Sequence, residues 1–336
     1  MTIKDIARLS GVGVATVSRV LNNYPDVSPA TRKKVLAVVE ACHFQPNSNA
    51  RRLKQQGGRR VAVVVKGAQN MLFAGMVEQV QLRFQDQGID VAVYYLDEDA
   101  SEAAFAVQMC REYKPSAILF LGGDLESFAE NFPDISVPAV LLTAGARALG
   151  FDNLSSVSTD DAAAAEQAVA YLIRRGHRRI GILGGNWSAS QISYQRILGC
   201  RRSFEAHGLP FDEGQCEPCR YAMADAYAAT GRLLERNPDL TAIFALSDMM
   251  AIGAIRALRD RGLRVPEDVS VMGFDGLAIG QFSVPRLTTV KQDTGLIAQR
   301  GEDILLERME RTLPPVWETA PFQLVEGESV STCPAP

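Results

Sequence analysis

The sequence predicts an α/β fold preceded by a small all-helical head, and three observations carry this prediction. Between residues 61 and 273, short apolar runs alternate with amphipathic stretches of helical spacing, as in parallel sheets covered by helices. Residues 1–45 show helical periodicity only. Charge also divides the chain: residues 1–60 hold eleven Lys and Arg against three acids, a balance of +8 in a chain of net charge −4. A basic head on an acidic body indicates a nucleic-acid-binding module joined to a different domain.

The head is expected to contain three helices. The first follows Thr2, a suitable N-cap, and ends at Gly11-Val12-Gly13. The second begins at Val14. The third begins at Ser28-Pro29, with Ser at the N-cap and Pro at the first helical position, and continues to about Cys42. The apolar residues whose spacing predicts these helices and their core are Ile3, Ile6, Ala7, Leu9, Val14, Val17, Val20, Leu21, Val35, Leu36, Val39 and Phe44.

The second helix also has an outward face formed by Val14, Ala15, Ser18 and Arg19, so its first residue is assigned to both faces. Two short helices joined by a glycine turn form a helix-turn-helix, whose second helix enters the DNA major groove. Arg19 can pair with guanine, and the small apolar residues can contact thymine methyl groups. A three-helix bundle without a DNA role is the alternative, but it does not predict this outward face. The residues suited to phosphate contacts are Thr2, Thr16, Asn22, Ser28 and Thr31.

Residues 2–53 resemble the DNA-binding head of the lactose/galactose repressor family of bacterial transcription regulators. Gly13 stands where the family usually has serine. The expected loss of helix stability is small, because glycine is an acceptable N-cap. Val14-Ala15 is the pair found in galactose-repressor-like members, which implies a related half-site. The strings that carry the resemblance are Ile3-Lys-Asp-Ile-Ala7, Ala15-Thr-Val-Ser-Arg-Val-Leu-Asn22, Val27-Ser-Pro-Ala-Thr-Arg32 and Pro46-Asn47…Ala50-Arg51-Arg-Leu53.

Residues 46–60 are expected to form a hinge helix and linker. Asn47 can cap a helix that ends near Gln55, before Gly57-Gly58, and this helix is too short to be stable alone in water. The resemblance implies that it folds on the operator, with Asn47, Arg51 and Leu53 at the minor groove and Leu53 wedged between base pairs, which kinks the duplex. An ordinary linker with one leucine is the alternative.

Residues 61–330 are expected to form the effector-binding and dimerisation domain. The alternation occurs in two rounds, which predicts two α/β lobes instead of one barrel. The predicted strands are 61–65, 90–95, 117–121, 139–142, 179–183, 242–245 and 269–273, and the predicted helices are 74–87, 101–113, 163–175, 190–207, 224–236 and 250–261. Ligands of such sheets bind at the carboxyl ends of strands. The loops there are 66–73, 122–124, 184–193, 247–248 and 273–276.

The resemblance extends over this domain, and the family's sensor in turn resembles periplasmic sugar-binding proteins, with two lobes, three crossovers and a ligand in the cleft. It implies a first lobe of about 61–159 and 291–318 and a second lobe of about 160–290 and 319–330. Segments that carry it include Tyr171-Leu-Ile-Arg-Arg-Gly-His, Arg196-Ile-Leu-Gly199, Ser247-Asp-Met-Met-Ala and Gly273-Phe-Asp275. The effector-binding positions that it implies are Phe73, Arg196, Tyr221, Ser247, Asp275 and Gln292, and Trp187 lies in a loop that is expected to face the cleft.

Five of these positions have a structural alternative. Arg196 could be a surface charge on a helix, and Asp275 could cap a helix or turn. Phe73 and Tyr221 could be core residues, and Trp187 could pack instead of stacking on a sugar ring. Asp160-Asp161 is expected to start a helix at a crossover.

These patterns predict a ligand-responsive transcription regulator, acting as a repressor on a palindromic operator. We expect a homodimer in the cytoplasm, because the chain has no heptad tail, secretion signal or long apolar run. The expected effector is a sugar or sugar derivative, with a nucleobase as the alternative. We expect no cofactor, metal or membrane partner, and reduced thiols at Cys216 and Cys219. An enzyme would need a phosphate loop or an acid/base pair, and a transport receptor would need a signal peptide; neither pattern is found.

Overall fold

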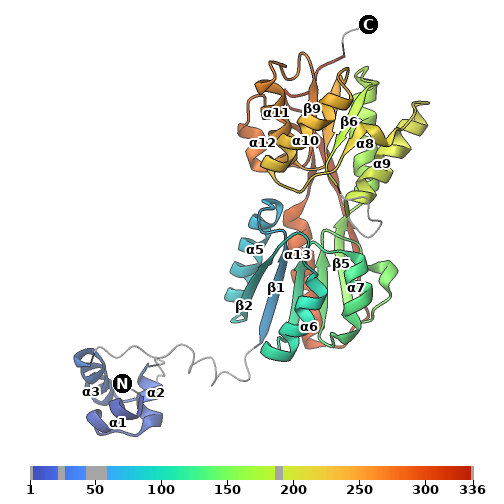
Figure 1. The fold of residues 1–336 in the computed structure, drawn as a ribbon. Helices are drawn as coiled ribbons and strands as arrows, with labels where there is room; N and C mark the ends of the chain where they lie inside the picture. Colours follow the sequence, from blue (N-terminus) through green and yellow to red (C-terminus); the bar gives the residue numbers. More distant parts are fainter. Residues whose placement is uncertain (1–2, 22–26, 43–58, 186–191, 334–336) are drawn as a thin grey trace. The chain divides into compact units, whose positions relative to one another are not determined.

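The computed structural model describes residues 3–21, 27–42, 59–185 and 192–333. The chain divides into two compact units, Met1–Gly58 and Arg59–Pro336 (Figure 1). The finer domain limits, 1–45, 46–60 and 61–330, stay predictions, and the expected hinge residues 47–55 lie outside the described part of the chain.

The first unit contains three helices: α1 Ile3–Ser10, α2 Val14–Leu21 and α3 Pro29–Ala41. Gly11 has a φ of +62°, the left-handed conformation that commonly ends a helix, and its N–H donates to the Arg8 carbonyl. Ser28 caps α3 by accepting from the Thr31 N–H, as expected. The buried core of the unit is Ile6, Ala7, Val17, Val20 and Val35.

Three residues expected in this core are exposed instead. Leu9, Val14 and Leu36 have 53%, 39% and 45% of their surface accessible. In α3 the core side comprises Val35 with Val38, Val39 and Cys42 packed against it, and Leu36 lies about 100° around the helix from Val35. The exposure of Val14 places it on the outward face only, and Phe44 lies outside the described residues.

The second unit contains two six-stranded sheets of the same design. The sheet orders are β11-β5-β4-β3-β1-β2 and β12-β10-β9-β8-β6-β7, and the two sheets with their helices are called here the first lobe and the second lobe. All pairs are parallel except β10 with β12. The strands are β1 Arg60–Lys66, β2 Asp90–Leu96, β3 Ala117–Leu121, β4 Ala139–Leu142, β5 Leu154–Thr159, β6 Ile180–Leu183, β7 Cys216–Glu217, β8 Ala242–Ala245, β9 Ser270–Asp275, β10 Thr288–Gln292, β11 Trp317–Ala320 and β12 Phe322–Val325.

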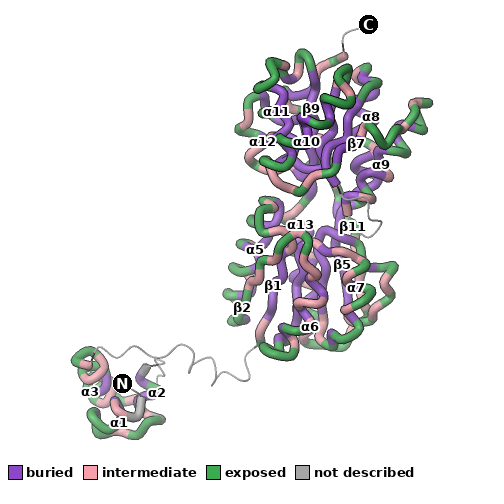
Figure 2. Tube along the Cα trace, viewed as in Figure 1, coloured by how far each residue is buried: buried purple, intermediate pink, exposed green. Residues whose placement is uncertain are grey.

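Helices cover both faces of each sheet. In the first lobe, α5 and α13 pack against one face, and α6 and α7 pack against the other, so that alternate residues of β1 and β3 belong to separate cores. In the first lobe the inner strands β1, β3, β4 and β5 are buried, whereas the edge strands β2 and β11 and the outer helix surfaces are partly exposed (Figure 2). The helices of the two lobes are α5 Leu72–Asp86, α6 Glu102–Tyr113, α7 Leu125–Asn131, α8 Asp161–Arg174, α9 Ile192–Ala206, α10 Met223–Arg236, α11 Asp248–Asp260, α12 Ala278–Phe282 and α13 Thr294–Glu310, and the 3-10 turns are η1 Phe132–Asp134, η2 Arg147–Leu149 and η3 Glu213–Gln215.

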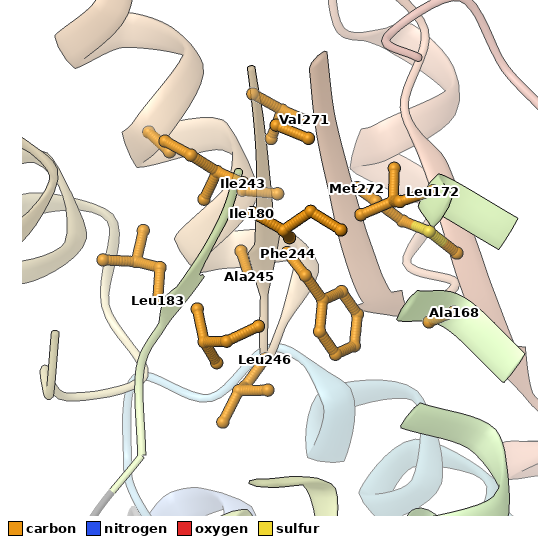
Figure 3. Close-up of a cluster of buried hydrophobic side chains, with 14 of the residues drawn as sticks. Ala168, Leu172, Ile180, Leu183, Ile243, Phe244, Ala245, Leu246, Val271 and Met272 are labelled. Carbon is orange, nitrogen blue, oxygen red and sulfur yellow. The ribbon is translucent and has the colours of Figure 1, made fainter. Parts of the chain in front are cut away.

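The second lobe has one continuous core around its strands. Phe244, Met272 and Leu172 pack together there with the aliphatic residues of β6 and β8 (Figure 3). Helices α8 and α9 cross closely at Gly199, where an added Cβ would lie 2.1 Å from the Ala162 carbonyl oxygen. This close crossing brings the start of α8 beside the first turns of α9.

Three connections join the lobes: β5 to α8, β10 to α13, and β11 to β12. All thirteen strands and helices expected between residues 61 and 273 are present, with small shifts at their ends. Strand β5 was not expected, because its sequence Leu154-Ser-Ser-Val-Ser-Thr159 contains no apolar run; its serines are buried and Ser155 accepts from Arg308. Strand β10 runs to Gln292 in the second lobe and β11 runs to Ala320 in the first, two residues past the lobe limits that were expected.

Candidate functional site

A pocket lies between the two lobes at the carboxyl ends of β1, β3, β4 and β9. Its empty volume is about 630 Å³, with open solvent included. The first lobe contributes loops that follow strands, and the second lobe contributes α9, the segment before α10 and the end of β9. The lining residues are Lys66, Gly67, Asn70, Leu72, Phe73, Glu98, Gly122, Gly123, Thr143, Ala144, Ile192, Arg196, Tyr221 and Asp275.

Arg196 is a buried cation with two carboxylate partners. Its side chain is 4% exposed, its Nε donates to Asp161 Oδ1 at 2.7 Å, and its Nη2 lies 3.5 Å from Asp275 Oδ1. The guanidinium also donates to the Leu246 carbonyl and lies 3.7 Å from the Phe274 ring centroid. Burial alone would lower the pKa of Arg196, but the charge of Asp161 raises it. The arginine therefore stays charged, and it is a rigid donor because its partners fix the guanidinium plane.

Asp275 is connected to the lobe crossovers by hydrogen bonds. Gln292 donates to Asp275 Oδ1 at 2.8 Å, and Thr159 donates to Gln292 Oε1 at 2.8 Å, so a chain of buried polar groups joins two crossover segments. Burial raises the pKa of Asp275 to about 6, against the opposing effects of Arg196 and Gln292. Asp275 and Thr143, on facing sides of the pocket, have φ values of +110° and +68°. Backbone strain of this kind in non-glycine residues gathers at functional sites.

Three buried polar atoms of the site have no protein partner within the described structure: Asp161 Oδ2, Asp275 Oδ2 and the Tyr221 hydroxyl. A buried polar group without a partner costs about 1–3 kcal/mol, so protein interiors seldom contain three together. Two carboxylate acceptors, a phenol that can donate and a guanidinium are the groups that bind hydroxyl-rich ligands. The arrangement can hold a polar small molecule without performing acid/base chemistry on it.

The first lobe contributes an aromatic ring and two charged residues to the pocket. The Phe73 ring lies against the turn at Gly122, where an added Cβ would be 3.0 Å from Phe73 Cζ. Lys66 donates to the buried carboxylate of Glu102 at 2.6 Å, so its charge is compensated. Glu98 accepts from the Tyr221 N–H at 3.2 Å across the cleft, and burial raises the pKa of this carboxyl.

Four of the seven effector-binding residues predicted from sequence line this pocket: Phe73, Arg196, Tyr221 and Asp275. Gln292 is one hydrogen bond removed, through Asp275. Ser247 does not line the pocket; it caps α11 by accepting from the Met250 N–H. Trp187 lies outside the described residues. Asp161, Glu98 and Lys66 were not predicted as effector-binding residues, although Lys66 begins the predicted loop 66–73. Lys66 ends β1 and Glu98 follows β2, where the rule for such sheets places ligands.

Burial and partners decide between the two interpretations of Arg196 and of Asp275. Phe73 and Tyr221 line the pocket and also pack in or against the lobe cores, so both of their interpretations stand. Arg196 is not a surface charge, and Asp275 holds no helix end. The turn after β9 is held instead by Asp248, which accepts from the Leu277 N–H and from the Thr289 hydroxyl. Burial, with the nearby charge of Asp275, raises the pKa of Asp248 to about 8.

The candidate DNA-contacting surface lies on α2. Val17 and Val20 are buried while Val14 and Arg19 are exposed, so α2 has the expected two-sided character. Ala15 and Ser18 lie within the same helix, and Thr16 is half-buried. Ser28 and Thr31 share a hydrogen bond of 2.8 Å at the exposed start of α3. Thr2, Asn22, Asn47, Arg51 and Leu53 lie outside the described residues.

No group of metal-ligating side chains is found within the described ranges. Burial raises the pKa of Cys216 and of Cys219 to about 12, so both side chains are neutral thiols and poor metal ligands. None of the described helices is both long and apolar enough to cross a membrane.

Comparisons with known proteins agree with this architecture. Residues 2–47 match the bacterial regulatory proteins of the lacI family, and residues 169–330 match the periplasmic binding protein-like domain. The chain is 36% identical to the transcriptional regulator MalR of Clostridium butyricum over 91% of this chain and 92% of the relative. It is 32% identical to the regulator GalR of Escherichia coli K12 over 98% and 96% of the two chains.

Solved structures agree across both units. A complex of the regulator CelR with cellobiose has a TM-score of 0.70 at 30% identity, and a lac repressor dimer bound to operator and an anti-inducer has a TM-score of 0.75 at 26% identity. Each comparison covers 98% of this chain and 99% of the other. The head, the two-lobed sensor and these similarities place the chain in the LacI family of bacterial transcription regulators, as a ligand-responsive regulator and not an enzyme.

Proposed function

We propose that this protein is a repressor whose affinity for a palindromic operator is controlled by an uncharged sugar in the interlobe pocket. The observation that carries the ligand class is Arg196, fixed between Asp161 and Asp275 with acceptor oxygens left over on both carboxylates. A polyhydroxylated ring can donate to these oxygens and accept from the guanidinium, while its apolar face rests on Phe73. The relative solved with cellobiose supports a sugar of this kind.

The charges of the pocket favour an uncharged sugar over a sugar phosphate. Among the described lining residues, the two cations are Lys66 and Arg196, and each already has a carboxylate partner within 2.7 Å. A phosphate would have to displace these partners and would also face Glu98 and Asp275. Binding a second anion there is opposed by like-charge repulsion in a poorly solvated site.

On DNA, α2 would contact base edges in the major groove, with Arg19 and Val14 exposed for this role and Ala15 and Ser18 on the same helix. We propose phosphate contacts by Thr2, Thr16, Asn22, Ser28 and Thr31, and a minor-groove role for the hinge residues Asn47, Arg51 and Leu53. A homodimer in the cytoplasm would place two heads on a palindrome, since helix-turn-helix dimers mirror their own symmetry in the operator. The lac repressor relative, a dimer on its operator, supports this assembly.

The effector would act by binding one interlobe arrangement better than the other, because only differential affinity can shift such an equilibrium. The test is a binding screen of the full chain against neutral sugars, sugar phosphates and nucleobases, followed by operator binding with and without each hit. A neutral sugar that raises the thermal midpoint and changes operator affinity is expected. Binding of only phosphorylated sugars or nucleobases would reject the proposed ligand class.

The DNA role is tested by Arg19→Ala. Loss of a bidentate guanine contact should weaken operator binding by about 1–3 kcal/mol, roughly tenfold or more, while random DNA loses only the effect of one charge. Arg8→Ala, which removes an exposed arginine of α1 paired with Asp5, is the matched control. Fluorescence anisotropy on operator and scrambled duplexes at one salt concentration gives the ratio. An equal loss on both duplexes would exclude base recognition by Arg19.

A further inference from the structure

A second pocket adjoins the first on the side of the lobe crossovers. Its empty volume is about 780 Å³, open solvent included. Ala144 and Ile192 line both pockets, so the two spaces meet at these side chains. The remaining lining is mainly polar and comes from the ends of β4, β5 and β11 and from the starts of α7, α8 and α9. These residues are Leu125, Gly145, Ser158, Thr159, Asp160, Asp161, Ala162, Gln195 and Thr319.

Asp161 connects the second pocket to the charged cluster of the first. Its side chain is 2% exposed, its Oδ1 accepts from Arg196 at 2.7 Å, and its Oδ2 has no partner in the described structure. Arg196 lines the first pocket while Asp161 lines the second, so one ion pair forms part of both walls. A ligand hydroxyl in the second pocket could donate to Asp161 Oδ2, just as one in the first pocket could donate to Asp275 Oδ2.

We propose that the second pocket is an additional sugar subsite and that the effector is an uncharged oligosaccharide of at least two units spanning both pockets. This inference rests on the proposed sugar-sensing function. The hydroxyl of Ser158 and the amide of Gln195 provide further donors and acceptors for hydroxyl groups. No Lys or Arg lines this pocket among the described residues, whereas Asp160 and Asp161 do, so an anionic unit is disfavoured.

Gly145 provides a way to fill the second pocket without disturbing the first. It is exposed, its φ is not positive, and an added Cβ would meet only Ser158 Oγ at 3.5 Å, an ordinary contact. In Gly145→Leu the new side chain should occupy the space of the second sugar unit. Gly75→Leu is the matched control, because Gly75 is exposed on α5, lines neither pocket and has open space at its Cβ.

The experiment is isothermal titration of the full chain with glucose, galactose, mannose and xylose, and with maltose, cellobiose, lactose, mannobiose and xylobiose. At least one disaccharide should bind tenfold or more tightly than its constituent monosaccharides. Gly145→Leu should remove most of that tenfold gain and leave monosaccharide affinity within twofold, while Gly75→Leu changes neither. Gln195→Ala shortens an exposed side chain of the second pocket and should lower disaccharide affinity about threefold. This second variant tests the subsite if Gly145→Leu does not fold.

The outcomes separate the two proposals. If a monosaccharide binds as tightly as every disaccharide that contains it, the second subsite is wrong while the sugar sensor stands. The same conclusion follows if both Gly145→Leu and Gln195→Ala leave disaccharide affinity unchanged. If none of these sugars binds the unmodified protein, the proposed sugar sensor is itself rejected, and the subsite with it.

Discussion

The two lobes of the sensor share one strand order but contribute different chemistry to the pocket between them. The second lobe supplies Arg196 with the buried carboxylates of Asp161 and Asp275, each of which keeps one oxygen without a partner in the described structure. These residues lie on elements packed around one continuous core. The first lobe supplies the Phe73 ring, glycine turns and charged groups that already have partners, namely Glu98 and the buried ion pair of Lys66 with Glu102. The two lobes therefore have the same fold but different roles at the pocket: the second lobe presents fixed polar groups to the ligand, and the first lobe covers it. We infer that contacts with the second lobe contribute most of the ligand affinity, and that the first lobe closes over the bound ligand.

The contacts between the lobes agree with this division. Arg220, before α10 in the second lobe, lies 2.6 Å from Asp97 and 3.6–3.7 Å from Asp99 and Glu98, which follow β2 in the first lobe. These ion pairs are largely exposed, unlike the Arg196 cluster. Exposed pairs contribute little to stability, whereas a buried pair is costly to break. Variants of the two lobes should therefore differ in both size and kind of effect.

The largest effect is expected for Arg196→Met in the second lobe. Removing the cation leaves two buried carboxylates without compensation, which should lower the free energy of unfolding by about 3–5 kcal/mol and reduce sugar affinity at least a hundredfold. Arg202→Met, an exposed arginine on the same helix, is the control. Urea denaturation and calorimetric titration measure the two quantities. If both variants behave alike, the second lobe does not hold the ligand through Arg196.

Asp275→Asn should have a smaller effect that depends on pH. With a pKa of about 6, the carboxylate becomes protonated as the pH falls from 7 to 5, so the wild-type affinity for the sugar should fall over that range. The variant should bind about ten- to a hundredfold more weakly at pH 7, since bonds to charged groups contribute about 1.5–3 kcal/mol. Its affinity should also vary less with pH.

The stability of Asp275→Asn gives an independent check. A folded-state pKa raised above the ordinary 3.8 favours folding below about pH 4, and this contribution is lost as the pH rises through 6. At pH 7 the native carboxylate therefore opposes folding, and the effector-free variant should not melt below the wild type. A clear fall in melting temperature, with unchanged sugar affinity, would make Asp275 a structural residue.

Sequence was a good guide to the regular part of the fold and to residues whose role follows from local pattern. The strands at 117–121, 139–142 and 242–245 are uninterrupted apolar runs, and their predicted limits match the structure. Strand β5 was missed because its serines are satisfied by distant groups, including Arg308, which no local window contains. The short strands β11 and β12 form by pairing with β5 and β10, which lie earlier in the chain, so their own sequences carry little strand signal.

The site shows the same limit more sharply. Arg196 and Asp275 were found through family resemblance, while Asp161 was interpreted only as a helix start. Asp160 does cap α8, by accepting from the Ala163 N–H, and this leaves Asp161 facing Arg196, 35 residues away in sequence. Glu98 faces Tyr221 only because the two lobes close on each other. Such pairings arise from the crossing of α8 with α9 and from lobe placement, which spacing along the chain does not encode.

The smallest effect is expected for Arg220→Ala, which removes the exposed ion pairs between the lobes. Because such pairs are weak and screened, sugar affinity should fall by no more than about fivefold, with stability nearly unchanged. The wild-type affinity should also weaken between 0.05 and 0.5 M salt, roughly a threefold contraction of the Debye length, whereas the variant should respond less.

Arg264→Ala is the control, because Arg264 pairs with Asp268 inside the second lobe and does not join the lobes. Calorimetric titration at both salt concentrations gives the comparison. If Arg220→Ala matched Arg196→Met in its loss of affinity, the first lobe would be holding the ligand through its acidic loop as strongly as the second lobe does through its buried cluster. The division into a binding lobe and a covering lobe would then be wrong.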